Sequence, residues 1–194
     1  MHVAKSGLRA LGIAESYSGR EQSTLAGVVI RKDLQIDGVA FARVTVGGSD
    51  ATDAIIRIFT RLARRDINLV MISGSVIAWY NIIDPSAVQD AIGLPVIVTT
   101  YEESDGLEED IRSHFPGDAG RLAAYRRLGD RIPVRLHSGY TLFIRPYGLS
   151  LDDAARLCND FTREGRVPEP VRVARLIARG LVRSSLSAPD DQNR

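Results

Sequence analysis

The stretch from Ile67 to Asp84 brings together residue types that could do chemistry at the end of a strand. Its apolar run Leu69–Ile72 has the length and β-propensity of a strand buried on both faces, and the run breaks at Ser73. Open α/β sheets place their chemistry just beyond the carboxyl ends of central strands. We therefore expect Ser73 to lie at a cleft, where its residue type determines what the cleft can bind.

Two aromatic residues follow this break. Trp79 is the only tryptophan, and Tyr80 comes directly after it. Their rings could stack on an extruded base of a nucleic acid. Alternatively, they could form an apolar cover over the edge of the sheet.

A glycine-containing turn, Gly47–Asp50, stands ahead of an amphipathic helix predicted over Ala51–Arg65. The paired glycines could present backbone N–H groups to a phosphate, or they could make a tight turn. Asp50 or Ser49 is a natural N-cap for the helix.

The last predicted helix, Pro170–Arg183, carries a row of basic residues at i, i+3, i+7 and i+11: Arg172, Arg175, Arg179 and Arg183. This spacing predicts one basic stripe opposite Ala174, Ile177 and Leu181. Such a stripe could follow the phosphates of a nucleic acid. The alternative is a solvated face that is partly paired with Glu164 or Glu169.

Composition bounds the class of protein. The chain has 194 residues, of which 44% are hydrophobic and 25% charged, as in one ordinary globular domain. Its formal charge of +1 argues against a global field for a polyanion, so any nucleic-acid surface must be a local patch. The single cysteine, Cys158, excludes an intramolecular disulfide, and no Cys/His spacing suggests zinc. No apolar run approaches the ~20 residues of a membrane span, and we expect a cytoplasmic protein.

The periodicity predicts the elements that position these residues. Three strands with short connections predict an antiparallel meander, and two αβ units follow it. This order places the first strand beside the fourth in the middle of one mixed sheet, which is the ribonuclease H-like arrangement. The predicted strands are Leu8–Ala14, Leu25–Arg31, Val39–Val46, Ile67–Ile72 and Leu94–Thr100, and the second helix is Pro85–Ile92.

The remaining chain predicts a helical extension that includes one hairpin. The hairpin spans Pro133–Pro146 and turns at Ser138-Gly139. The predicted helices are Leu107–His114, Gly120–Leu128, Leu151–Glu164 and Pro170–Arg183. We expect one α/β domain over residues 1–185 and a flexible tail over residues 186–194.

Several segments resemble the archaeal endonuclease dU family, formerly a domain of unknown function and a relative of endonuclease V. The segments are Val44–Thr52, Trp79–Asp84, Gly93–Val98 and, most specifically, Gly165–Arg183. The resemblance runs from about Leu8 to Arg183. It implies a ribonuclease H-like fold and a nuclease that depends on magnesium or manganese and acts in DNA repair on deaminated bases, deoxyuridine above all. Asn81 also matches the family, and together with Trp79, Tyr80 and the four arginines of the last helix it is a candidate nucleic-acid contact.

The family pattern implies acidic residues after the first, third and fourth strands. Three of the expected acids read Ala14, Gly47 and Ser73 in this chain, and only Glu15 and Asp50 keep a carboxylate. Glu15 and Asp50 are therefore the candidate catalytic residues and metal ligands. Strand alternation argues against Glu15 replacing residue 14, because adjacent side chains point to opposite faces. We expect impaired cleavage, and the alternative is a catalytically inactive domain that binds DNA, RNA or a protein.

Overall fold

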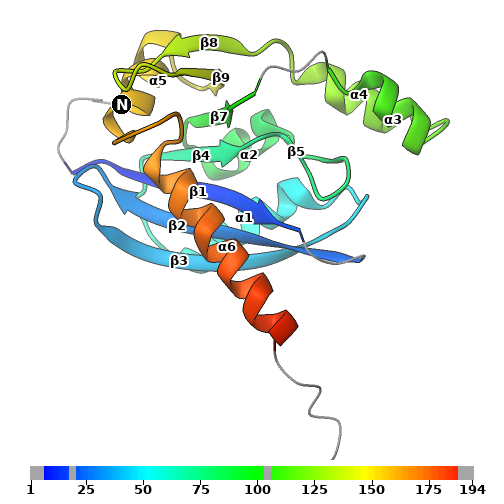
Figure 1. Ribbon diagram of the computed structural model, residues 1–194, viewed down its shortest axis with the longest axis horizontal. Coiled ribbons are helices and arrows are strands. Elements are labelled where there is room, and N and C mark those ends of the chain that lie inside the picture. Colours follow the sequence, from blue (N-terminus) through cyan, green and yellow to red (C-terminus); the bar gives the residue numbers. More distant parts are fainter. Residues whose placement is uncertain (1–6, 18–20, 103–105, 188–194) are drawn as a thin grey trace, which may run out of the picture.

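A seven-stranded mixed sheet forms the centre of the computed structural model, which describes residues 7–17, 21–102 and 106–187 (Figure 1). The strand order is β3-β2-β1-β4-β7-β9-β8. Strands β1, β4 and β7 are parallel, and the other neighbouring pairs are antiparallel. The strands are β1 (Arg9–Ser16), β2 (Gln22–Arg31), β3 (Ile36–Thr45), β4 (Leu69–Ser73), β7 (Val96–Thr100), β8 (Ile132–Arg135) and β9 (Thr141–Tyr147).

Helices cover both faces of this sheet. On one face lie α1 (Ala51–Leu62) and α2 (Pro85–Ile92), and on the other lie α5 (Leu151–Asp160) and α6 (Glu169–Ser187). Helix α6 crosses β1 and β2 diagonally (Figure 1). A short helical pair, α3 (Glu108–His114) and α4 (Ala119–Arg127), extends to one side of the sheet (Figure 1).

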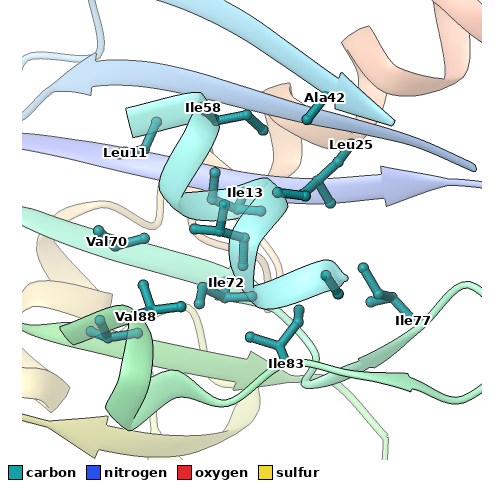
Figure 2. Packing of buried hydrophobic residues seen from close by; sticks show 14 of the residues in the cluster. Leu11, Ile13, Leu25, Ala42, Ile58, Val70, Ile72, Ile77, Ile83 and Val88 are labelled. Carbon is teal, nitrogen blue, oxygen red and sulfur yellow. The ribbon is translucent and has the colours of Figure 1, made fainter. Parts of the chain in front are cut away.

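The two faces hold separate cores, which the alternation along β1 illustrates. Leu11 and Ile13 pack into the core under α1 and α2, as Figure 2 shows, whereas Ala10 and Ala14 join the core under α5 and α6. Ala14 therefore faces α6. Cys158 is fully buried in the same core, as expected for a small core residue, and burial raises the pKa of its thiol to about 12.

Two glycines bring the helices close to the sheet. A Cβ on Gly12 would lie 2.1 Å from the backbone of Pro170, so the start of α6 can rest on β1 only because residue 12 has no side chain. On the opposite face, a Cβ on Gly27 would lie 2.3 Å from Cγ2 of Ile58 in α1. The two glycines therefore allow α6 and α1 to lie close to the two faces of the sheet.

The predicted elements occur in the predicted order. The predicted hairpin Pro133–Pro146 forms β8 and β9, which extend the main sheet beside β7, and the other predicted elements differ at their boundaries. Helix α1 stops at Leu62 because Ala63 adopts a left-handed C-cap, so Arg65 is not helical. Helix α5 ends at Asp160, before the predicted Glu164. Helix α6 continues through Ser187, two residues into the predicted tail. The rest of that tail, residues 188–194, lies outside the described residues, as do residues 18–20 between the first two strands.

A second, two-stranded sheet was not predicted. It pairs β5 (Val76–Ile77) with β6 (Asn81–Ile82). Between them Ala78, Trp79 and Tyr80 all have positive φ angles, of 41°, 58° and 60°. Within the described segments, no helix is both long and apolar enough to span a membrane.

Candidate active site and nucleic-acid interface

The carboxyl ends of β1, β3 and β4 meet at one edge of the sheet. β4 runs parallel to β1, and β3 has the same direction because two antiparallel pairings connect it to β1. The candidate residues Glu15, Asp50 and Ser73 lie at or just beyond these strand ends. The backbone thus brings these three candidate residues to one edge of the sheet.

Ser73 is bound by an arginine from the last helix. Nη2 of Arg175 donates to Oγ of Ser73 at 2.7 Å, and the guanidinium carbon lies 4.9 Å from the centre of the Tyr101 ring. The Tyr101 hydroxyl lies 3.0 Å from Oγ1 of Thr99. The positively charged guanidinium of Arg175 thus occupies the end of β4. It contacts a hydroxyl and an aromatic face, and not a carboxylate.

Burial raises the pKa of Tyr101 above its ordinary value, although hydrogen bonds with Thr99 and Ser73 and the charge of Arg175 act in the opposite direction. The phenol therefore remains neutral at physiological pH. It can donate one hydrogen bond within the network, but it supplies no negative charge to the guanidinium.

Ala14 stands beside Ser73 on the same face. The register pairs Ile13 with Ile72, so the next residues of the two strands are Ala14 and Ser73. Ala14 is 2% exposed and belongs to the core under α6. Two of the three positions where acids were expected therefore carry a methyl group and a hydroxyl on the face that α6 covers, and the hydroxyl binds Arg175.

Glu15 points away from this corner. It alternates with Ala14 along β1, and its carboxylate accepts a hydrogen bond from Oγ of Ser23 in β2. Glu15 therefore does not take the place of residue 14, as strand alternation predicted.

Asp50 is the N-cap residue of α1, as predicted, but its side chain does not cap the helix. Its carboxylate accepts hydrogen bonds from the backbone N and Oγ1 of Thr45 and from Nδ2 of Asn81, at 3.0, 3.0 and 2.7 Å. Partial burial raises the pKa of Asp50, but the hydrogen bonds from Thr45 and Asn81 outweigh it, and the net shift is downward. The carboxylate is therefore ionised, and its oxygens already accept hydrogen bonds from the protein.

Asn81 supplies the cap that Asp50 does not. Its Oδ1 accepts from the backbone N–H of Ala51, and its Nδ2 donates to the carbonyl of Thr45 as well as to Asp50. The side chain is fully buried. Asn81 thus joins β3, the turn and α1, and in this conformation its amide is not accessible to a ligand.

The glycine turn does not present free N–H groups to a phosphate. Gly47 N donates to the carbonyl of Ala78 at 2.7 Å, and Gly48 N donates to that of Thr45 at 3.1 Å. The phosphate-cradle interpretation was therefore wrong, and the tight-turn alternative holds. Gly47 is needed for a φ of +69°.

Arg121 of α4 ties this turn to the β5–β6 loop. Its guanidinium donates to the carbonyls of Gly47, Gly48 and Tyr80 and lies 3.9 Å from the centre of the Phe115 ring. Arg121 was not among the site residues predicted from the sequence. No local pattern could have identified it, because these three carbonyl partners are 41 to 74 positions away.

The same contacts support an aromatic cluster made of Trp79, Tyr80, His114 and Phe115. The Trp79 ring lies 4.7 Å from the His114 ring, and the Tyr80 ring lies 5.9 Å from that of Phe115. Trp79 is 51% exposed, so part of a large ring faces solvent near the Gly47 turn. The ring packs against His114 at the end of α3, and its stacking on an extruded base stays a prediction.

The four arginines of α6 have different surroundings. The buried face of the helix is Val171, Ala174, Ala178 and Val182, and Arg175 borders it and turns to Ser73. Arg172 pairs with Glu169 at 2.6 Å, as the alternative interpretation expected, while Arg179 and Arg183 are exposed. Leu181, expected opposite the stripe, is 39% exposed.

A pocket of about 240 Å³ opens beside the ends of β4 and β7. Gly74 and Ser75, just after β4, and Thr100 at the end of β7 line it, together with Arg145 of β9 and Tyr125 of α4. It is large enough to receive a small planar group next to the Ser73 corner.

The residues at the edge do not fit a two-metal centre. Such a centre needs two or three carboxylates that converge on the cations. Within the described part of the chain, no group of three or more Asp, Glu, His or Cys side chains could hold a metal ion. The guanidinium of Arg175 at Ser73 would also repel a divalent cation.

The fold and the strand-end edge define a ribonuclease H-like α/β protein. The described chain is similar to human ENDOV, with a TM-score of 0.67 and 18% identity over 96% of this chain and 89% of that chain. It is also similar to Ciona intestinalis endonuclease V in a complex with DNA containing an inosine, with a TM-score of 0.62 and 15% identity over 92% and 87% of the two chains.

The chain belongs to the endonuclease dU family, whose match covers residues 6–182. A UPF0215 protein of Pyrobaculum calidifontis is 41% identical over 91% of this chain and 98% of that protein. A protein of unknown function from Archaeoglobus fulgidus has a TM-score of 0.78 and 25% identity over 90% of this chain and 98% of that chain. The predicted family, its relation to endonuclease V and the ribonuclease H-like fold are thus confirmed.

Proposed function

We propose that this chain binds DNA containing a deaminated base, deoxyuridine above all, and that its metal-dependent cleavage is impaired. The observation that carries the proposal is the hydrogen bond of 2.7 Å from Arg175 to Ser73 at the end of β4. Phosphodiester hydrolysis by divalent metal needs converging carboxylates there. A guanidinium beside a hydroxyl instead favours an anion such as a phosphate.

The surrounding surface supports a role in binding. The exposed part of the Trp79 ring offers a stacking face, and the pocket beside Gly74 has room for a small planar group. Arg179 and Arg183 continue along α6 from the Arg175 corner. In the proposal Arg175 contacts a phosphate at the strand end, and the exposed arginines extend that contact along the strand.

The related endonuclease V structure in complex with DNA supports DNA as the partner. We propose a role in DNA repair in the cytoplasm. Residual cleavage would require Mg²⁺ or Mn²⁺, with Glu15 and Asp50 as the remaining carboxylates on the family motifs.

Cleavage and binding assays test the proposal on the same substrates. We expect duplexes with one deoxyuridine or deoxyinosine to be cut in Mg²⁺ or Mn²⁺ no faster by the chain than by its Asp50→Ala variant. The same duplexes should bind in a salt-dependent manner, and Arg175→Ala or Arg179→Ala should weaken the binding. Efficient cleavage by the unaltered chain would overturn the impaired-activity proposal. Binding that is insensitive to salt and to both substitutions would overturn the nucleic-acid role.

Restoring the acids provides a gain-of-function test. We expect Ala14→Asp with Ser73→Asp to remain inactive while Arg175 is present, because the guanidinium neutralises the new carboxylates. Adding Arg175→Gln should then produce metal-dependent cleavage, while Gly47 is kept because of its positive φ. The matched control carries Asn in place of each new Asp.

A further inference from the structure

A groove of about 670 Å³ runs along the outer edge of the sheet, at β3. We call it the β3 groove. Strands β2 and β3, helix α1 and the last turns of α6 all contribute to it. None of its lining residues is acidic: Thr24, Phe41, Ala42, Arg43, Arg57, Arg61, Leu181 and Ser184.

The strand alternation explains which side chains face the groove. Ala42 and Val44 of β3 pack into the core under α1, so Phe41 and Arg43 point to the opposite face. That is the face of α6, where Leu181 and Ser184 form the other wall. The Phe41 side chain is 36% exposed and Leu181 is 39% exposed, so the groove is partly apolar.

Three arginines line this groove without a compensating carboxylate. Nη1 of Arg61 donates to the carbonyl of Phe41 at 2.7 Å, and Nη2 of Arg57 lies 3.5 Å from the carbonyl of Arg43. Among the described residues, none of the three arginines forms an ion pair. Three like charges gathered around one groove repel one another, and an anion bound among them would relieve that repulsion.

The edge geometry distinguishes between two kinds of anionic partner. An acidic peptide would most readily add as a strand to the free edge of β3. However, the edge carbonyls of Phe41 and Arg43 already accept hydrogen bonds from Arg61 and Arg57, which obstructs strand addition. A nucleic-acid strand needs no backbone pairing, because it uses guanidinium groups for its phosphates and aromatic rings for its bases.

We infer that the β3 groove is a second nucleic-acid site, which takes the phosphodiester backbone of a single strand on Arg43, Arg57 and Arg61 and a base on Phe41. The site is separate from the Ser73 corner and does not depend on a damaged base. It goes beyond the proposed function because a strand bound there would need no lesion.

Binding of a labelled oligothymidylate, followed by fluorescence anisotropy at several salt concentrations, tests the inference. Arg43→Gln is the cleanest variant, because the Arg43 side chain makes no hydrogen bond or ion pair in the described structure. It should weaken binding several-fold and reduce the magnitude of the salt slope by about 0.7, the contribution of one phosphate on a single strand. Phe41→Leu should weaken binding by about fivefold or more, the loss of one stacked base.

The matched control is Arg156→Gln, an exposed arginine of α5 outside the groove. It removes the same charge and should leave the affinity and the salt slope unchanged. The Arg43→Gln variant should also keep its discrimination between deoxyuridine-containing and undamaged duplexes, which separates this site from the proposed function.

Several results would overturn the inference. One is equal binding of oligothymidylate by Arg43→Gln and the unaltered chain, with the same salt slope. Another is an equal loss of affinity in the Arg156→Gln control. A third is binding of polyglutamate that depends on Arg43 while oligothymidylate binding does not, which would identify an acidic polypeptide as the ligand. Thermal melting of each variant, expected to match the unaltered chain, excludes unfolding as the cause of a loss.

Discussion

At the scale of single residues, the charge at the end of β4 is positive and not negative. Ser73 and Ala14 are small and neutral, and the charged group nearest to Ser73 is the guanidinium of Arg175. Substitution to a carboxylate at this corner should therefore form an ion pair and not an isolated buried charge.

Ser73→Asp should accordingly stabilise the protein. Pairing with Arg175 lowers the pKa of the new carboxyl in the folded state, so its contribution is present above the unfolded value of ~3.9 and is lost as the pH falls through the folded value. The melting temperature of the variant relative to the unaltered chain should rise from pH 3 to about pH 6. Ser73→Asn, which adds no charge, should show a difference that does not vary with pH. A variant that melts lower than the unaltered chain at neutral pH would contradict this account of the corner.

Asn81 offers a second test at the residue scale. Asn81→Asp keeps an acceptor for the N–H of Ala51 but sets a second carboxylate against Asp50. Repulsion raises the pKa of the coupled pair in the folded state, so stability is lost as the pH rises through that value. We expect the deficit relative to the unaltered chain to be larger at pH 7.5 than at about pH 4.

The uncharged Asn81→Ala provides the control. It leaves a buried N–H unpaired at a cost of about 1–3 kcal/mol, and this deficit should be present at neutral pH without any charge repulsion. If Asn81→Asp had the same deficit at both pH values, Asp50 would not be the partner that the hydrogen bonds indicate.

At the scale of elements, the position of α6 depends on a residue without a side chain. Gly12→Ala would put a Cβ 2.1 Å from backbone atoms of Pro170, which cannot move as a flexible side chain can. We expect a loss at or above the upper end of the roughly 1–3 kcal/mol typical of overpacking, measured by denaturant unfolding.

Gly180→Ala is the matched control within α6, since nothing lies within 4 Å of the added Cβ. An exposed helical glycine replaced by alanine should gain roughly 0.5–1 kcal/mol. Equal effects at the two glycines would show that Gly12 does not set the helix position.

The Gly47 turn and the β5–β6 loop are predicted to move together when Arg121 is removed. Arg121→Ala deletes donors to the carbonyls of Gly47, Gly48 and Tyr80. Amide hydrogen exchange at Gly47 and Gly48 should become faster, and the fluorescence of Trp79 should shift as its packing on α3 loosens. Arg127→Ala, an exposed arginine at the end of the same helix, should change neither signal. Unchanged amide hydrogen exchange in Arg121→Ala would contradict the conclusion that Arg121 holds the Gly47 turn against the β5–β6 loop.

The elements that were predictable have a clear hydrophobic pattern. β4 is a continuous apolar run and α1 has apolar residues at helical spacing, and the order of such elements is sufficient to indicate the sheet. The β5–β6 hairpin is too short to show any period, and its left-handed turn at Ala78–Tyr80 contains no glycine to indicate it. The direction of the Arg175 side chain was unpredictable for a different reason. A rotation of α6 about its axis by one residue would decide whether this side chain faces solvent or Ser73.

At the scale of the whole molecule, the sheet has one long open edge. Strand β3 is outermost, and its residues Ile36, Val39 and Phe41 are exposed. Exposed apolar edges of this kind pair readily with other chains unless charges protect them. Arg57 and Arg61 of α1 provide that protection, because they bind the edge carbonyls of Arg43 and Phe41.

The double variant Arg57→Ala/Arg61→Ala should therefore self-associate more than the unaltered chain. Removing both arginines exposes two edge carbonyls beside apolar side chains, and a second β3 strand can then pair with them. Light scattering after size exclusion should show a larger mass that increases with concentration. The control Arg65→Ala/Arg156→Ala removes the same charge from two exposed positions and should keep the mass of the unaltered chain. Equal masses for all three proteins would mean that the edge of β3 is protected by something other than these two arginines.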